Sequence, residues 1–489
     1  MRKTIIFFEK LNFRSKWIII FFLLVLPRII YIYFNSITTA DSLFYLEVAE
    51  NINQGCGFAF TDNLGECQPL SGGYFPAYPY FIWFLKSIGF TDKMIPSLVS
   101  ILAISSVIYL SNTLLKYGLE EKKIYTLIFM IGFSPISFGY SRYLLIEPVL
   151  YIFSVLLLAE FIKLKAGLEY FKFIYLRIIL FTILAVLFRP TSIIFIIPHF
   201  LITLQNYGIK KFIKAFLSFS LILMLTIIPW GLRDMKYGNN TPFRSRPNNS
   251  PVNSEGYKNW VSTFSLTEYE YASAMFPIYN RKSGDRKKIV INTKWNPFIS
   301  KNDSDLKEIK QILNEDNPLI KRGFTKNEEE IFNQLAKNRI KTNGILGNSF
   351  LIIIKSLSLL LHPLNSWGWP LQIGLDAKFS IFNGELITKI FFKLLIFVYR
   401  LFLFSLYFKY ILIFIRLFNP INLFSQNNYN LIQNNSILIG SLLVLSTNLI
   451  MFVGIFNGLE HRYFYPVMPW IEFLVFFKFI NHKFFKYIT

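Results

Sequence analysis

The feature that most constrains this sequence is a series of apolar runs of about 15 to 20 residues, separated by short Lys-rich or Arg-rich segments. A helix needs roughly 20 mainly apolar residues to cross the hydrocarbon core of a bilayer. The pattern predicts ten spans, at 17–35, 96–114, 124–140, 148–162, 174–188, 191–207, 215–231, 386–408, 437–456 and 464–480. We therefore expect an all-α polytopic membrane protein, which excludes a soluble globular enzyme and a disordered chain.

The charge distribution fits the same interpretation. The chain has 51 Lys and Arg against 29 Asp and Glu, a net charge of +22, which in a soluble protein would point to nucleic acid. If the N-terminus lies in the cytoplasm, every second connection between spans lies there too. The basic residues concentrate in these segments, of which 1–16 is the first and 478–489 the last. Cytoplasmic loops are enriched in Lys and Arg. We therefore predict a multi-pass protein of the cell membrane with both termini in the cytoplasm and no nucleic-acid partner.

Two predicted outer connections are long enough to fold outside the bilayer. The first is expected to carry short helices, and the second to form a mainly helical domain. Residues 345–361 are apolar enough for an eleventh span, but Lys355 in mid-run and the basic C-terminus favour an interfacial helix. The predicted parts are a module of about seven spans, 1–231, with outer loop 36–95; a loop domain, 232–384; and a module of about three spans, 385–489.

The two cysteines, Cys56 and Cys67, both fall in the first outer loop. An oxidising outer face could join them in a disulfide, and two free thiols are the alternative. No His lies beside either Cys, so we expect no metal site there. The Asp303-Ser304-Asp305 sequence matches a metal-binding D-x-D pattern, but its polar, Lys-rich surroundings favour a solvated helix start.

Ionisable residues at the predicted outer ends of the spans are the candidates for function, because such groups are costly in a membrane and are usually kept for a task. Six positions qualify, and together they predict one basic pocket with two carboxylates at its rim: Asp41, Arg142, Glu147, Arg189, Arg233 and the pair His461 with Arg462. Arg28 lies about two turns inside the first span and could reach the same pocket or snorkel to the lipid headgroups.

The order of these residues along the chain follows a pattern of short motifs at span ends. The motifs are Asp41-Ser42-Leu43-Phe44-Tyr45, Pro76-Ala77-Tyr78-Pro79, Leu145-Ile146-Glu147-Pro148, Arg189-Pro190-Thr191, Pro229-Trp230 with Arg233, and His461-Arg462-Tyr463 with Pro466 and Pro469. This series resembles the GT-C superfamily of polytopic glycosyltransferases, in the branch of protein O-mannosyltransferases and aminoarabinose transferases. The resemblance runs through almost the whole chain. The chain departs from it at Ser42, where many relatives have a second acid, and at Ala77, where Gly is usual.

The resemblance implies transfer of a sugar from a polyprenyl-phosphate donor to a hydroxyl of a protein, lipid or glycan acceptor on the outer face, with inversion at the anomeric carbon. It makes Asp41 the candidate general base and Glu147 a second catalytic carboxylate. Substrate or phosphate-binding candidates are Tyr45, Arg189, Arg233, His461, Arg462, Tyr463 and Arg28. No cofactor is required on this interpretation, and no divalent metal is indicated. Enrichment in Phe, Ile, Asn and Lys favours a bacterial envelope and undecaprenyl phosphate as the donor lipid.

Structural roles remain open for the same residues. Asp41 could cap a helix over 42–53, Glu147 could cap the fourth span, and Arg189 could snorkel. Aromatic residues of the loop domain could form a lid or acceptor surface, or simply that domain's core: Tyr257, Trp260, Tyr269 and Tyr271. Alternative functions are a transporter or flippase of lipid-linked glycans and a non-catalytic scaffold, neither of which would depend on Asp41.

Overall fold

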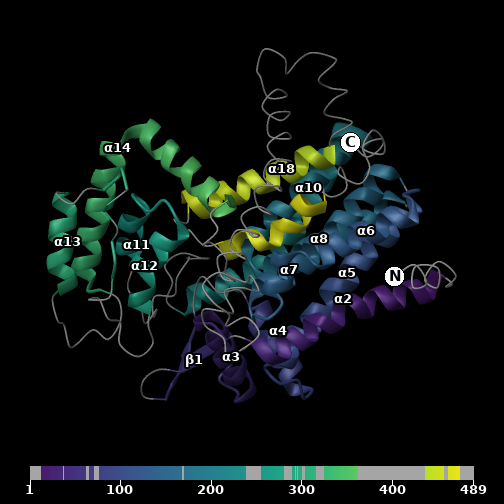
Figure 1. The fold of residues 1–489 in the computed structure, drawn as a ribbon, viewed down its shortest axis with the longest axis horizontal. Coiled ribbons are helices and arrows are strands. Elements are labelled where there is room, and N and C mark those ends of the chain that lie inside the picture. Colours follow the sequence, from purple (N-terminus) through teal and green to yellow (C-terminus); the bar gives the residue numbers. More distant parts are fainter. Residues whose placement is uncertain are drawn as a thin grey trace, which may run out of the picture.

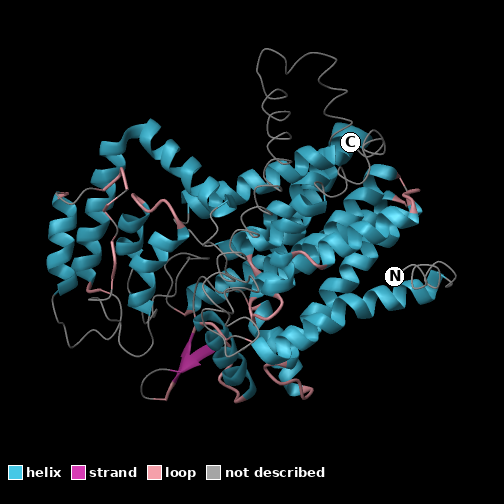
Figure 2. Cartoon of the chain, in the orientation of Figure 1, coloured by secondary structure: helices cyan, strands magenta, loops and turns pink. Residues whose placement is uncertain are grey.

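The computed structural model describes residues 13–36, 38–61, 65–70, 76–167, 170–237, 255–279, 289–291, 293–294, 296–299, 303–314, 324–361, 436–455 and 461–473. These residues are mostly helical, and the strands among them pair in a two-stranded sheet (Figure 2). The mainly helical fold predicted from the sequence is thus confirmed. The predicted span 386–408 lies outside the described residues.

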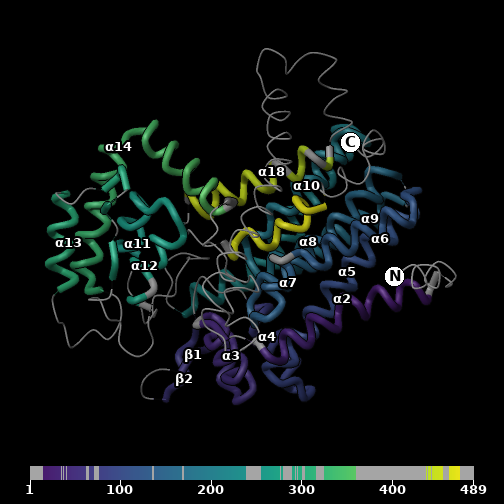
Figure 3. Tube along the Cα trace, viewed as in Figure 1, coloured from purple at the N-terminus to yellow at the C-terminus, as the bar shows by residue number. Residues whose placement is uncertain are grey.

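Four segments of the described chain are long and apolar enough to cross a membrane: Ser15–Phe34, Met94–Lys116, Phe171–Phe188 and Pro190–Lys236. They lie in helices α2 (Phe13–Asn35), α5 (Met94–Lys116), α9 (Phe171–Phe188) and the pair η1 (Pro190–Ile196) with α10 (Ile197–Lys236). Helix α8 (Ile146–Ala166) packs against α5 and α9, and α2 packs on α5 (Figure 3). These apolar helices support a membrane protein, while the ten-span topology and the cytoplasmic termini stay predictions.

The apolar stretch of η1 and α10 folds back on itself at Gly208. This residue has φ of 79°, in the left-handed region that glycine adopts without strain. The ring of Phe200 lies 5.8 Å from that of Phe219, whereas a straight helix would separate the two residues by about 28 Å. Tyr175 of α9 also donates a hydrogen bond to the Ala215 carbonyl beyond the turn, at 2.8 Å. The stretch therefore consists of two arms, which correspond to the predicted spans 191–207 and 215–231.

The predicted span 124–140 is instead two helices, α6 (Glu121–Gly132) and α7 (Pro135–Tyr140). Ser134 caps α7 by accepting a hydrogen bond from the Ser137 amide, at 3.5 Å. Pro135, at the start of α7, has no amide hydrogen and cannot continue the preceding helix. The sequence-based boundary was wrong because the run was taken as continuous across this proline.

The segment predicted to be the first outer loop forms helix α3 (Ala40–Asn53), strands β1 (Ala59–Thr61) and β2 (Cys67–Pro69), and helix α4 (Ala77–Ser87). The strands pair antiparallel, with Thr61 opposite Cys67, and α3 packs on both β1 and α4. Their apolar contacts centre on Val48, Phe58 and Leu70. The loop is therefore a small packed unit at the end of the bundle.

Helices α11 (Glu255–Ser262), α12 (Glu268–Tyr279), α13 (Ser304–Asn314) and α14 (Lys326–Leu361) gather at one side of the molecule, away from α2, α5 and α6 (Figures 1 and 3). Tyr257 and Trp260 are fully buried there, and the Tyr257 ring packs against Phe324 and Phe332 at 4.9 and 5.1 Å. Tyr257 and Trp260 therefore belong to the core of this group; Tyr271 is buried as well, whereas Tyr269 is 62% exposed.

Helix α14 turns at Gly344, where φ is 63°. Beyond the turn, Lys355 is buried and donates a hydrogen bond to the Ser262 carbonyl at the end of α11. The turn therefore separates the polar first part of α14 from the apolar run over 345–361. The interfacial position predicted for the apolar helix stays a prediction.

The D-x-D sequence begins α13. The Asp303 carboxylate accepts a hydrogen bond from the Asp305 amide at 3.1 Å, as a helix cap does. Both carboxylates pair with Arg339 of α14, at 2.7 Å from Asp303 and 3.4 Å from Asp305. This arrangement fits a helix start and an ion pair between α13 and α14.

The last described segments are α18 (Ser436–Leu449), the π-helical turn η3 (Ile450–Ile455) and the 3₁₀ helix η4 (His461–Val467). Helix α18 packs against α10, and η4 packs against α8. The C-terminal part of the chain is thus held against helices from the first half of the sequence, which brings His461-Arg462-Tyr463 next to the N-terminal motifs.

Candidate functional site

Asp41 and Arg462 form an ion pair, although 421 positions separate them. Asp41 lies in the first turn of α3, but Thr39 caps this helix. The Thr39 hydroxyl accepts from the Ser42 amide at 3.1 Å, and the Ser42 hydroxyl accepts from the Thr39 amide at 3.0 Å. The alternative in which Asp41 is the helix cap is therefore wrong, and its carboxylate is directed to Arg462.

A second ion pair joins Glu147 and Arg189, whose Oε1 and Nη2 atoms lie 2.9 Å apart. Glu147 is in the first turn of α8 and its side chain is 1% exposed. Arg189 ends α9 with extended backbone, φ −153°, before Pro190 begins η1. The change from helix to extended backbone at Arg189 directs its side chain to α8, where it pairs with Glu147. Arg189 therefore does more than snorkel to the lipid headgroups.

Tyr463 connects the two ion pairs. The guanidinium carbon of Arg189 and that of Arg462 each lie 5.1 Å from the centre of its ring. The Tyr463 hydroxyl also accepts a hydrogen bond from Nη2 of Arg462 at 3.3 Å, and Phe452 stacks on the ring at 4.4 Å. Cation–π contacts of this kind favour a fixed geometry. Asp41, Arg462, Tyr463, Arg189 and Glu147 thus form one continuous cluster.

Tyr45 belongs to the edge of this cluster. Its ring is buried and meets Tyr78 edge to face at 4.9 Å. Burial lowers the pKa of the Arg189 guanidinium, but the negative potential of Glu147, Tyr463 and Tyr45 outweighs burial and raises the pKa above its ordinary value. Arg462 acts on the same group in the opposite direction. Arg189 therefore keeps its positive charge within reach of Tyr45 and Arg462.

Three residues near the cluster carried no sequence signal. Tyr140, at the end of α7, stacks on Tyr465 at 4.4 Å and lies within electrostatic reach of Glu147, Arg462 and Glu268. Its neighbour Tyr143 contacts it at 6.0 Å between ring centres. Glu268 is a buried residue at the start of α12, so the outlying helical group brings a carboxylate towards the bundle. The two tyrosines could not be recognised from the sequence, because tyrosine is common both in protein cores and in functional sites.

Arg233 does not join this cluster. Its guanidinium donates to the carbonyls of Leu70 and Phe58, at 2.7 and 2.9 Å, and lies over the rings of Phe58 and Trp230 at 5.2 and 4.6 Å. Arg233 therefore binds the β1–β2 hairpin to the end of α10. The prediction of a shared basic pocket did not foresee this, because the hairpin could not be located from the sequence.

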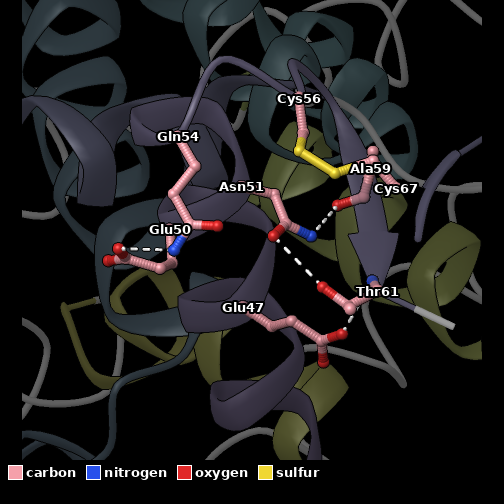
Figure 4. The surroundings of a disulfide bond; sticks show 8 residues. All are labelled: Glu47, Glu50, Asn51, Gln54, Cys56, Ala59, Thr61 and Cys67. Atoms are coloured by element: carbon pink, nitrogen blue, oxygen red, sulfur yellow. Dashed lines mark hydrogen bonds between the residues drawn. A yellow bond between two sulfur atoms is a disulfide. The ribbon is translucent and has the colours of Figure 1, made fainter. Parts of the chain in front are cut away.

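A disulfide joins Cys56 and Cys67 in the same hairpin, with Cα atoms 5.8 Å apart (Figure 4). The side chain of Asn51 supports it by donating to the Ala59 carbonyl at 3.0 Å and accepting from the Thr61 hydroxyl at 3.2 Å. The hairpin is thus held on α3 from one side and by Arg233 from the other.

Arg28 is buried and donates hydrogen bonds to acceptors at the junction between α6 and α7. It donates to the Gly132 carbonyl and, at 3.2 and 3.1 Å, to the carbonyl and hydroxyl of Ser137. Ser134 in turn donates to the buried carboxylate of Glu472. Arg28 therefore replaces the helical hydrogen bonds that Pro135 interrupts, and this contact explains its burial without a ligand.

The other predicted residues are quickly placed. Arg142 is buried between α7 and α8, next to Tyr143. The backbone of His461 begins η4, but its side chain lies outside what the structure describes. Among the described residues, no group of three or more His, Cys, Asp or Glu could hold a metal ion.

Searches against protein-family models, curated proteins and solved structures found no match. Chemical interpretation therefore rests on the cluster itself. It contains one carboxylate whose side chain is 45% exposed, that of Asp41, and one that is almost fully buried, that of Glu147. An accessible carboxylate can take a proton from a bound molecule, and the neighbouring guanidinium groups can stabilise an anion.

Proposed function

We propose that this chain is an integral membrane glycosyltransferase that moves a sugar from a polyprenyl-phosphate donor to an acceptor hydroxyl on the outer face of the membrane. The observation that carries the proposal is the convergence of the Asp41–Arg462 and Glu147–Arg189 pairs on Tyr463. These residues come from four predicted span ends that follow one another in the order of the GT-C motifs. The proposal requires these residues to lie together in space, and motifs unrelated to one another would have no reason to do so.

In the proposed reaction, the acceptor hydroxyl attacks the anomeric carbon and Asp41 takes its proton. A bond forms between the acceptor oxygen and the anomeric carbon, while the bond from that carbon to the phosphate oxygen breaks. The polyprenyl phosphate leaves as an anion, so it needs no general acid. Asp41 suits the base better than Glu147, because its side chain is 45% exposed and that of Glu147 is 1% exposed.

The arginines have distinct parts in this mechanism. Arg462 orients the Asp41 carboxylate through their ion pair and can stabilise negative charge on the leaving phosphate. Glu147 holds Arg189 against the Tyr463 ring, so it is a positioning residue in this arrangement. A single displacement inverts the configuration of the sugar.

The test uses the full chain, purified and placed in lipid nanodiscs with undecaprenyl-phosphate sugars labelled in the sugar. We expect transfer or release of the label, and a loss of about 100-fold or more in kcat for Asp41→Asn. Glu50→Gln is the matched control, since Glu50 is exposed on the same helix and accepts a hydrogen bond from the Gln54 side chain at 3.2 Å. The stereochemistry of the product should be inverted.

Two results would contradict the proposal. Full activity of Asp41→Asn would remove this residue as the base. Movement of lipid-linked glycans across proteoliposomes, at the same rate in Asp41→Asn and with no sugar transfer, would instead establish the transporter alternative.

A further inference from the structure

Arg142 is a fully buried guanidinium with little to neutralise it. The residue is 1% exposed, and its Nη2 donates one hydrogen bond, to the Tyr143 hydroxyl at 2.7 Å. Its guanidinium carbon lies 4.8 Å from the centre of the same ring. Nε and Nη1 are buried and donate no hydrogen bond, and no carboxylate of the described chain pairs with the group. One N–H on Nε and two on Nη1 are therefore unused.

The other buried arginines of the outer end show what is missing at this position. Arg189 pairs with Glu147, and Arg462 pairs with Asp41. Arg28 is as deeply buried as Arg142, but it donates to two backbone carbonyls and a hydroxyl. An arginine cannot relieve its burial by losing its proton. A buried charge that lacks a partner is strongly unfavourable, so such a group is usually kept for a ligand.

We propose that Arg142 and Tyr143 bind an oxyanion of a ligand, a phosphate ester or a carboxylate. The Tyr143 hydroxyl accepts from Arg142 and so can direct its own hydrogen to the same anion. Guanidinium donors suit these groups in charge and geometry. This inference rests on the burial and hydrogen bonding of Arg142, and it does not require the proposed glycosyltransferase activity.

The position indicates an anion with an apolar tail. Tyr31 of α2, an apolar span, lies within electrostatic reach of Arg142 and packs on Phe138 at 5.0 Å between ring centres. On its other side, Tyr143 contacts Tyr140, which lies within reach of Glu147 and Arg462. The bound oxyanion would therefore lie between an apolar helix and the candidate site, where a headgroup attached to a lipid chain fits.

Thermal unfolding of the full chain in a non-ionic detergent tests the proposal. The probes are dodecyl phosphate, dodecanoate, inorganic phosphate and the neutral analogue dodecanol. In the wild type, dodecyl phosphate should raise Tm and dodecanol should not, because the two differ only in the oxyanion. A response to inorganic phosphate as well assigns a small free anion as the source, and a response to dodecyl phosphate alone assigns a lipid-linked group.

Arg142→Met gives the decisive comparison. Without ligand, this variant should melt at the same temperature as the wild type or higher, since an unpaired buried charge has been replaced by an apolar side chain of similar length. Its binding of dodecyl phosphate should be about tenfold weaker or more. Arg28→Met is the matched control, which should melt lower because it leaves the Gly132 and Ser137 acceptors unpaired, while the anion still raises its Tm.

Tyr143→Phe provides a second measurement if Arg142→Met does not fold. It keeps the charge but removes the hydroxyl, so the anion should still bind, several-fold more weakly. No rise in Tm of the wild type with any of the three oxyanions would overturn the proposal. An unchanged rise in Arg142→Met would overturn it as well.

Discussion

Removal of both partners of the Glu147–Arg189 pair should cost far less than the sum of the two single removals. The side chains are 1% and 18% exposed and their charged atoms lie 2.9 Å apart, so both are largely withdrawn from water. Loss of one member of a buried pair leaves an uncompensated charge and costs about 3 to 5 kcal/mol. Since Arg189 keeps some exposure, we expect about 3 kcal/mol for Glu147→Leu or Arg189→Met. The double variant should lose only about 1 kcal/mol more than either, or less.

The assay is a double-mutant cycle on the free energy of unfolding, measured by SDS titration in dodecyl maltoside micelles with tryptophan fluorescence. The coupling energy expected between the two sites is about 2 kcal/mol or more. The exposed Glu120–Lys123 pair, with a separation of 2.8 Å, is the control. Its coupling should be about 0.5 kcal/mol or less, because its side chains are 70% and 29% exposed. Additive effects at Glu147 and Arg189 would refute the buried pair and the positioning of Arg189 that depends on it.

Three further perturbations act on other parts of the structure. Cys56→Ser with Cys67→Ser should lower the free energy of unfolding by about 2 to 3 kcal/mol, the value for a closed loop of 11 residues, and the wild type with reductant should match it. Arg233→Met should speed amide hydrogen exchange in β1 and β2 about tenfold or more, with α5 and α8 unchanged, because it removes both carbonyl contacts of the hairpin. Burial lowers the pKa of Lys355 from 10.5 to about 7, so between these pH values the unfolded chain binds the extra proton and stability should rise with pH. Unfolding titrations at pH 6, 8 and 9.5 should show this rise in the wild type and its absence in Lys355→Met.

The helical elements followed from the sequence because hydropathy acts at the scale of a whole helix. The apolar runs at 17–35, 96–114 and 174–188 became α2, α5 and α9 with ends shifted by a few residues. The break within 124–140 depends on a single residue, Pro135, whose effect an average over the run conceals. The signal was present, since the Ser134-Pro135 sequence is typical of a helix start.

The partners of the charged residues could not be predicted in the same way. Sequence placed Asp41, Glu147, Arg189 and Arg462 at neighbouring span ends, but it gave no rotation of the helices about their axes. That rotation decides which carboxylate meets which arginine. Arg233 illustrates the limit, because its partners are the backbone carbonyls of a hairpin whose position depends on tertiary packing.

The distribution of partners changes the electrostatics expected of the site. Five arginines at span ends predicted a strongly basic pocket, but Arg189, Arg462 and Arg233 have carboxylate partners, and Arg28 donates to backbone carbonyls. Arg142, buried beside Tyr143, leaves two of its nitrogens, Nε and Nη1, without an acceptor among the described residues. A single buried guanidinium such as that of Arg142 favours a monoanion over a dianion, since the second charge of a dianion would be desolvated without a partner. A phosphodiester, which carries a single negative charge, meets that condition, and this is the charge of a polyprenyl-phosphate sugar.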